Sequence, residues 1–321
     1  MRPSPGPADD LTPRHPRQQP DVEAALAEAC RQAGLNPRHA RLIRHFSNAV
    51  YLVDGVVARV SYGPDGVSRA ERGLAAAHWL AGQGFPVAAP VDIAASGEPS
   101  PVLVMNDTAP PMAVTFWTYH PQPDDLAPDF HALGHLALLL HRVPAPPPIE
   151  LPAYEPLASL QHALAAPSAA LALDPDSLEW LAARAAALAA AVATVPSALG
   201  VGLIHADMWS GNLLHAPGQG HRGWLLGDWD SVCIGPREVD LAPTAVAKRF
   251  GGDERSAAQV ASGYGVDVRD WPGYPLLRAV RELSTLSSLI KLAARHPDSA
   301  RELELRLNSL RRGDDALWNR Q

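Results

Sequence analysis

Apolar residues in the first 120 positions switch between helical and strand-like spacing. Helical spacing predicts one helix from Asp21 to Ala33, with Asp21 as its N-cap, and a second over residues 68–83. Between them, β-branched runs flank Asp54-Gly55, a pair typical of a tight hairpin turn. Three more short strands are expected after the second helix, at 86–95, 100–106 and 113–121. The pattern therefore predicts a small, largely antiparallel sheet with few helices.

The rest of the chain has mainly helical spacing, broken by proline-rich loops. An acidic, proline-rich connector begins near residue 120, and two short apolar runs within 203–234 predict strands around a polar turn. The remaining apolar stripes predict helices at 130–142, 157–165, 177–195, 242–250, 254–264, 274–294 and 299–311. We therefore predict an α+β protein whose second half is mainly α-helical.

Composition limits the class of protein. Of 321 residues, 47% are hydrophobic, enough for the cores of one large or two ordinary domains. The two cysteines are too few for a disulfide framework, which favours a cytoplasmic location. Residues 1–20 are polar and proline-rich, and we expect a disordered lead. The most apolar window ends at Pro196, short of a membrane span, so we expect no membrane association.

Charge is uneven between the two halves. Residues 1–120 carry 10 basic and 11 acidic groups, whereas residues 121–321 carry 17 and 23. An acidic half favours a cationic partner over a nucleic acid, so a cationic small molecule is the expected partner and no nucleic acid is expected.

Three polar residues at the ends of apolar runs are the strongest chemical signal. Asp207 is followed five positions later by Asn212, and Asp228 comes after sixteen more. Carboxylate and amide oxygens are ligands that Mg²⁺ favours, usually together with substrate phosphates. A second carboxylate can face an incoming hydroxyl while the other two groups hold the metal, as phosphoryl transfer requires.

These residues carry a resemblance to a known family. HADMWSGN, residues 205–212, is similar to the H-x-D-x-x-x-x-N catalytic loop of the aminoglycoside phosphotransferase and choline kinase family, relatives of the protein kinases, and GDWD, residues 227–230, resembles its metal-binding segment. The resemblance implies a two-lobed, protein-kinase-like fold that uses ATP and Mg²⁺. In it Asp207 is the catalytic residue, Asn212 and Asp228 are metal ligands, and His205 is structural. It implies an N-lobe over residues 21–120 and a C-lobe over 121–321.

The same resemblance implies a nucleotide site in the N-lobe. Arg59 stands where the family has a strand Lys or Arg, and it must serve here because the only lysines are Lys248 and Lys291. Glu71 stands at the position of its acidic partner. The remaining implied contacts lie in a phosphate-covering loop and in a hinge at the adenine: Ser47, Asn48, Phe116, Trp117, Thr118 and Tyr119.

Other polar and aromatic residues near the loop allow two interpretations each. Asp240 is expected to anchor the C-lobe, whereas Asp230 either supports the metal loop or lies in a solvated turn. His215 and His221 suggest a metal pair or, better, an exposed mobile turn. Trp209 and Trp229 either stack on a substrate ring or pack locally.

The expected reaction is phosphoryl transfer from ATP to a small-molecule hydroxyl. An aminoglycoside-type or other antibiotic is the favoured acceptor, with resistance as the outcome. A metabolic kinase for choline, homoserine or fructosamine is the first alternative, and a catalytically silent nucleotide-binding protein is the second. The acceptor is expected to meet helices within 150–195 and 250–290, with Asp253 and Glu282 as candidate contacts.

Overall fold

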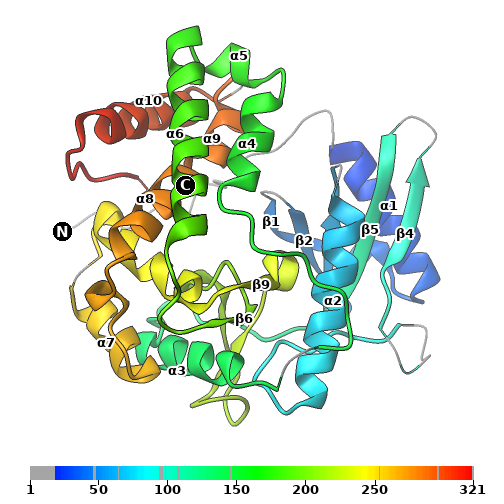
Figure 1. Ribbon diagram of the computed structural model, residues 1–321. Helices are drawn as coiled ribbons and strands as arrows, with labels where there is room; N and C mark the ends of the chain where they lie inside the picture. Colours follow the sequence, from blue (N-terminus) through cyan, green and yellow to red (C-terminus); the bar gives the residue numbers. More distant parts are fainter. Residues whose placement is uncertain are drawn as a thin grey trace, which may run out of the picture. The chain divides into compact units, whose positions relative to one another are not determined.

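The protein divides into two compact units in the computed structural model (Figure 1). The described residues are 19–45, 48–63, 65–93, 97, 99–106, 109–144, 147–252, 254–294 and 296–319. The first unit comprises residues up to His78 and Ala88–His120, and the second comprises Trp79–Val87 and Pro121–Gln321. Each unit is described by itself.

The first unit is built on a five-stranded antiparallel sheet. Its order is β1-β2-β3-β5-β4, and its strands are β1 (Arg41–His45), β2 (Asn48–Val53), β3 (Val56–Ser61), β4 (Val102–Asn106) and β5 (Ala109–Thr118). The β2–β3 hairpin turns at Asp54 (φ 47°) and Gly55 (φ 84°), as expected for a primed turn. Helix α1 (Gln19–Gln32) belongs to this unit, and α2 (Gly66–Gly82) begins in it.

The two faces of this sheet have different roles. Alternate residues of β2, β3 and β5, among them Ala58, Val60 and Phe116, form one core with the apolar side of α1. Because side chains alternate along a strand, Arg59 is on the opposite face, in one row with its pairing partners Val50 and Thr115. The sheet thus separates its apolar core from a face that carries a buried cation.

The second unit is mainly helical. Its largest core joins leucines and alanines of α4, α6, α8, α9 and α10, which gather around the long helix α6 in Figure 1. Helix α3 packs against α7. The α-helices are α3 (Phe130–His141), α4 (Ala158–Ala165), α5 (Ala169–Ala172), α6 (Pro175–Thr194), α7 (Glu254–Tyr264), α8 (Tyr274–Ser284), α9 (Leu286–Ala293) and α10 (Pro297–Arg312).

Two small antiparallel sheets support the loops of this unit. Strand β6 (Val201–Ile204) pairs with β9 (Cys233–Pro236), and β7 (Leu213–His215) pairs with β8 (Trp224–Leu226). The 3₁₀ segments of the protein are η1 (Pro37–His39), η2 (Ser210–Asn212), η3 (Trp229–Ser231), η4 (Arg237–Phe250) and η5 (Val268–Asp270). The expected polar segments therefore follow β6 and β8, and they lead into η2 and η3.

Several sequence predictions need correction. Helix α1 starts at Gln19, so Asp21 lies within its first turn and is not the N-cap. A strand was expected at 86–95, but its described residues, 86–93, form only isolated bridges, since Pro86 and Pro90 lack the N–H that a ladder needs. The expected helix 274–294 is two helices that meet at Thr285. Of the expected disordered lead, residues 1–20, the first 18 lie outside the described residues, and residues 19 and 20 belong to α1.

Membrane insertion gains no support from the helices. Within the described ranges, none is both long and apolar enough to cross a bilayer.

Candidate active site

The loop after β6 presents Asp207 to solvent. Ile204 and His205 are fully buried, whereas the side chain of Asp207 is 35% exposed. Between them Ala206 has a left-handed backbone (φ 62°), which an L-residue adopts at a cost of about 1–2 kcal/mol. The strained turn lets a buried strand end in an accessible carboxylate.

Asp240 holds this turn in place. Its carboxylate accepts hydrogen bonds from the backbone N–H of His205 (2.9 Å) and of Ala206 (2.7 Å), and a third from His141 Nε2 (3.1 Å). The side chain of Asp240 is fully buried. Tyr264 completes the chain of bonds by donating its hydroxyl to His141 Nδ1 (2.8 Å), and burial raises the pKa of Tyr264 to about 12. These contacts support the anchoring role expected for Asp240.

His205 links the loop to the segment that contains Asp228. Its Nε2 contacts the carbonyl oxygen of Gly227 (2.9 Å) and must carry the proton, since a carbonyl can only accept. Its Nδ1 accepts from the backbone N–H of Asp207 (3.3 Å). The ring therefore has the structural role that the resemblance implied.

Asn212 and Asp228 lie on adjoining strand ends. The carbonyl of Asn212 accepts from the N–H of Gly227 (2.9 Å), one residue before Asp228. The Asn212 amide donates Nδ2–H to the carbonyl of Asp207 (2.8 Å), and its Oδ1 has no hydrogen bond within the described residues. Asp228 has a left-handed backbone (φ 63°). An amide oxygen and a carboxylate at adjoining strand ends fit a hard cation such as Mg²⁺.

Arg281 is a neighbour of Asp207 that the sequence patterns missed. From α8, its Nη2 donates to Asp207 Oδ1 at 3.0 Å, while Oδ2 lies 3.5 Å from Asn212 Nδ2. Both oxygens of the carboxylate therefore have a neighbouring donor. No motif or spacing could have found Arg281, because it is one of 25 arginines and lies 74 residues after Asp207.

The two tryptophans near the loop differ in environment. Trp229 is fully buried and packs against Phe85 and His205, with ring centroids 5.7 and 4.7 Å apart, so its stacking on a substrate is excluded. Trp209 is 43% exposed, and its ring lies so close to Gly211 that a Cβ there would clash at 2.3 Å. Stacking therefore remains open for Trp209 alone.

The nucleotide residues expected in the first unit have mixed environments. Asn48 and Arg59 are buried at 8% and 7% exposure, and Trp117 is on the same sheet face as Arg59. Glu71 is exposed on α2, and no ion pair joins it to Arg59 in the described part of the chain. Ser47 lies outside the described residues.

Two of the residues expected at the hinge, Phe116 and Thr118, form backbone hydrogen bonds with the segment that precedes β4. The Phe116 ring is only 2% exposed and belongs to the core on the α1 side of the sheet, so only its backbone is open to a nucleotide on the other face. The Phe116 carbonyl accepts from Val91 N–H (2.8 Å), and the Thr118 N–H donates to Ala89 (2.9 Å). The side chains of Thr118 and Tyr119 are exposed and half-buried, respectively.

Two further expectations fail. His221 is not on an exposed turn: it stacks on His135 of α3 with ring centroids 3.9 Å apart, and burial and neighbouring cationic groups lower its pKa. No group of three His, Cys, Asp or Glu side chains suited to a metal occurs among the described residues.

The two candidate acceptor contacts gain no support. Glu282 is buried and paired with Arg249 (2.8 Å), so it is not an acceptor contact, and Asp253 lies outside the described residues.

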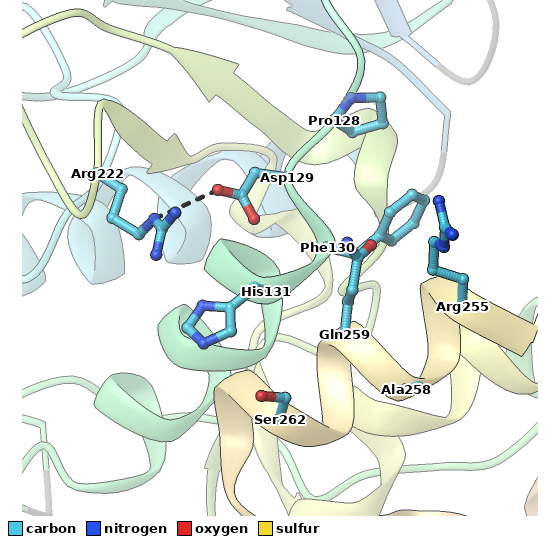
Figure 2. Close-up of a pocket in the computed structure, with 9 residues that line it drawn as sticks. All are labelled: Pro128, Asp129, Phe130, His131, Arg222, Arg255, Ala258, Gln259 and Ser262. Atoms are coloured by element: carbon cyan, nitrogen blue, oxygen red, sulfur yellow. Dashed lines mark ion pairs between the residues drawn. The ribbon is translucent and has the colours of Figure 1, made fainter.

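A cavity of about 530 Å³ lies elsewhere on the second unit, between the start of α3 and α7 (Figure 2). Asp129 and Arg222 form an ion pair of 3.5 Å at its edge, and Arg255 extends from α7. None of the predicted catalytic, metal or nucleotide residues lines it. It is therefore separate from the candidate active site.

A β-sheet unit followed by a helical unit whose buried Asp anchors an H-x-D loop defines a protein-kinase-like phosphotransferase. The profile of the phosphotransferase enzyme family (APH) matches residues 39–279, and the chain belongs to this family. It is a phosphotransferase that acts on hydroxyl groups. A comparison with curated protein sequences finds no significant match.

Solved structures share the fold at low sequence identity. An amicoumacin kinase, hAmiN, in complex with AMP-PNP, Ca²⁺ and Ami has a TM-score of 0.70 and 14% identity, covering 95% of this chain and 98% of that one. A microcompartment-associated aminopropanol kinase has a TM-score of 0.64 and 20% identity, covering 88% and 93%. A choline/ethanolamine kinase family protein from Mesorhizobium loti has 0.56 and 16%, covering 92% and 94%.

Proposed function

We propose that this phosphotransferase transfers the γ-phosphoryl group of ATP to a hydroxyl of an antibiotic or related natural product. The observation that carries the proposal is the accessible Asp207 carboxylate, fixed beside Asn212 on a loop anchored by Asp240. The likeness to an amicoumacin kinase over 95% of this chain favours an antibiotic as acceptor.

Asp207 orients the acceptor hydroxyl and accepts its proton. The hydroxyl oxygen then forms a bond to the γ-phosphorus, the bond from that phosphorus to the β,γ-bridging oxygen breaks, and ADP leaves with the electron pair. Asn212 and Asp228 would hold Mg²⁺, which when bound supplies positive charge to the phosphate oxygens. The hydrogen bond from Asn212 Nδ2 to the Asp207 carbonyl holds the proposed metal ligand next to the proposed proton acceptor.

The nucleotide contacts in the first unit are part of this proposal. Arg59 contacts the phosphates from the sheet face opposite α1, together with Asn48. Trp117, Thr118 and Tyr119 supply the adenine end. This assignment is supported by the shared sheet face of Arg59 and Trp117. The bracing role of Glu71 has less support, since the ion pairs of the described residues do not include one between Glu71 and Arg59.

A metabolic kinase is the second candidate function. It is favoured by the likeness to an aminopropanol kinase and to a choline/ethanolamine kinase family protein. A silent nucleotide-binding protein is disfavoured because Asp207, Asn212 and Asp228 are all present in a supported loop.

ADP release with a panel of acceptors tests the proposal. Purified protein, ATP and Mg²⁺ are combined with aminoglycosides, other hydroxylated antibiotics, homoserine, choline or aminopropanol, and an acceptor-free reaction is the baseline. We expect at least one antibiotic to raise ADP release above that baseline. Stimulation by a metabolite alone would favour the metabolic kinase. If no acceptor raises ADP release and Asp228→Ala leaves the nucleotide affinity unchanged, the enzymatic proposal is refuted.

A further inference from the structure

Arg281 places a guanidinium directly beside Asp207, the proposed proton acceptor. Its Nη2 lies 3.0 Å from Asp207 Oδ1, and the side chain is 29% exposed. A guanidinium has five N–H donors in a planar fork. Asp207 is its only polar partner in the part of the chain that the structure describes, so most of these donors are available to a ligand.

The charges around Asp207 do not favour a polycation. Arg281 balances the charge of Asp207, and Asp228 is the proposed ligand of a divalent cation. A cationic acceptor would therefore meet the guanidinium beside the reacting hydroxyl, where like charges repel.

Four carboxylates of the acidic second half are buried and used inside the protein. Glu238, at 0% exposure, accepts from the N–H groups of Ala198 and Leu199, and Asp240 accepts from the catalytic loop. Glu282 and Glu302 are buried in ion pairs with arginines. These four carboxylates cannot attract a solute, so the net charge of the second half overstates the negative charge at its surface.

We propose that Arg281 binds a carboxylate of the acceptor, so that the substrates are hydroxy acids or zwitterions and not polycations of the aminoglycoside type. The inference rests on the proposed function, whose acceptor class it narrows. A carboxylate matches the planar fork of Arg in a bidentate geometry. When the free N–H groups of Arg281 hold the carboxylate of the acceptor, a hydroxyl close to that carboxylate lies near Asp207. The positive charge of Arg281 offsets the repulsion between the acceptor's carboxylate and Asp207.

Three acceptors that differ in one group test this selectivity. Glycerate, glycerol and 3-amino-1,2-propanediol share a diol and carry a carboxylate, a hydroxyl or an ammonium. We expect wild-type protein to bind glycerate at least about tenfold better than the amine, a difference of about 1.4 kcal/mol, because the hydrogen bonds to Arg281 join two charged groups. Calorimetric titration in the presence of AMP-PNP and Mg²⁺ measures binding, and kcat/KM with ATP measures transfer.

Substitutions at Arg281 assign the selectivity to this side chain. Arg281→Gln should lose the preference, Arg281→Glu should reverse it in favour of the amine, and Arg281→Lys should retain it in weakened form. Arg278→Gln is the matched control, because Arg278 is on the same helix, is similarly exposed at 33% and is paired with Glu282 and Asp315. That control should keep the wild-type ranking.

Each outcome decides the inference. Equal binding of the three acceptors, a wild-type preference for the amine, or an Arg281→Gln protein that keeps the glycerate preference would overturn it. A uniform fall in kcat without a change in ranking would also overturn it, because Arg281 would then only position Asp207. Selective, Arg281-dependent binding of glycerate without transfer to any acceptor would support the inference and count against the proposed function.

Discussion

Replacing Asp240 by Ala removes the support of the catalytic loop. The Asp240 carboxylate accepts three hydrogen bonds, two from the backbone N–H groups of His205 and Ala206 and one from His141, in a fully buried environment. Each buried donor left without a partner costs about 1–3 kcal/mol. Because Asp240→Ala leaves three such donors, we expect it to lower the free energy of unfolding by at least about 3 kcal/mol.

The same substitution should impair catalysis beyond its effect on stability. Without the carboxylate, Ala206 can leave its left-handed conformation and Asp207 shifts with it. A displacement of about 1 Å at a reacting group can cost about 100-fold in rate. We expect kcat to fall by about that factor at a temperature where the variant is still folded.

Urea denaturation followed by fluorescence, together with ADP release, measures both effects. Asp240→Asn is the matched variant, since its amide oxygen can accept from one backbone N–H while its NH₂ group cannot accept from the other. It should lose about 1–3 kcal/mol. If the free energy of unfolding of Asp240→Ala is within about 1 kcal/mol of the wild-type value and kcat is unchanged, the anchoring role is refuted.

Three further predictions concern backbone strain, the C-terminal segment and pH. Ala206→Gly should raise the free energy of unfolding by up to about 1 kcal/mol, because relief of the left-handed strain exceeds the added entropy of the unfolded chain; a thermal melt checks this, and a clear loss of stability contradicts it. Arg249→Met should lower the free energy of unfolding by about 1–3 kcal/mol, because the carbonyl of Asp314 loses a donor (2.6 Å) and Glu282 keeps only its partly exposed partner Arg278. In urea titration the double variant with Glu282→Met should lose less than the two single losses combined. Burial lowers the pKa of His45, so at acidic pH the unfolded chain binds more protons than the folded chain. The stability that this histidine contributes above about pH 6.5 should therefore be lost as the pH falls. Thermal melts at pH 7.5 and 5.5 should show a smaller loss of stability for His45→Gln than for wild type.

Local parts of the fold and site could be predicted from sequence. The Asp54-Gly55 hairpin depends on two residues with a strong preference for left-handed backbone. Asn212 and Asp228 come together because a short hairpin, β7–β8, joins them, so their spacing in the chain determines their proximity. These features depend on residues that are close together in the sequence, so one sequence alone is enough to predict them.

Features that depend on tertiary packing were missed. Arg281 reaches Asp207 across 74 positions, and no pattern distinguishes it from other arginines on apolar-striped helices. The break at Thr285 follows from hydroxyls that bond to backbone carbonyls: Ser284 to Arg281, Thr285 to Glu282 and Ser287 to Ser284. Helical periodicity continues through this break, so apolar spacing alone predicted one helix.

The effect of Asp207→Asn on phosphoryl transfer tests the central claim most directly. The substitution keeps the size and shape of the side chain, but it replaces one acceptor oxygen by an NH₂ donor and removes the ability to accept a proton at neutral pH. With an acceptor that wild type phosphorylates, kcat should fall by about 10²–10⁴-fold while the dissociation constant for AMP-PNP and Mg²⁺ stays within about threefold of wild type. An Asp207→Asn protein that retains wild-type turnover would contradict the assignment of Asp207 and the mechanism built on it.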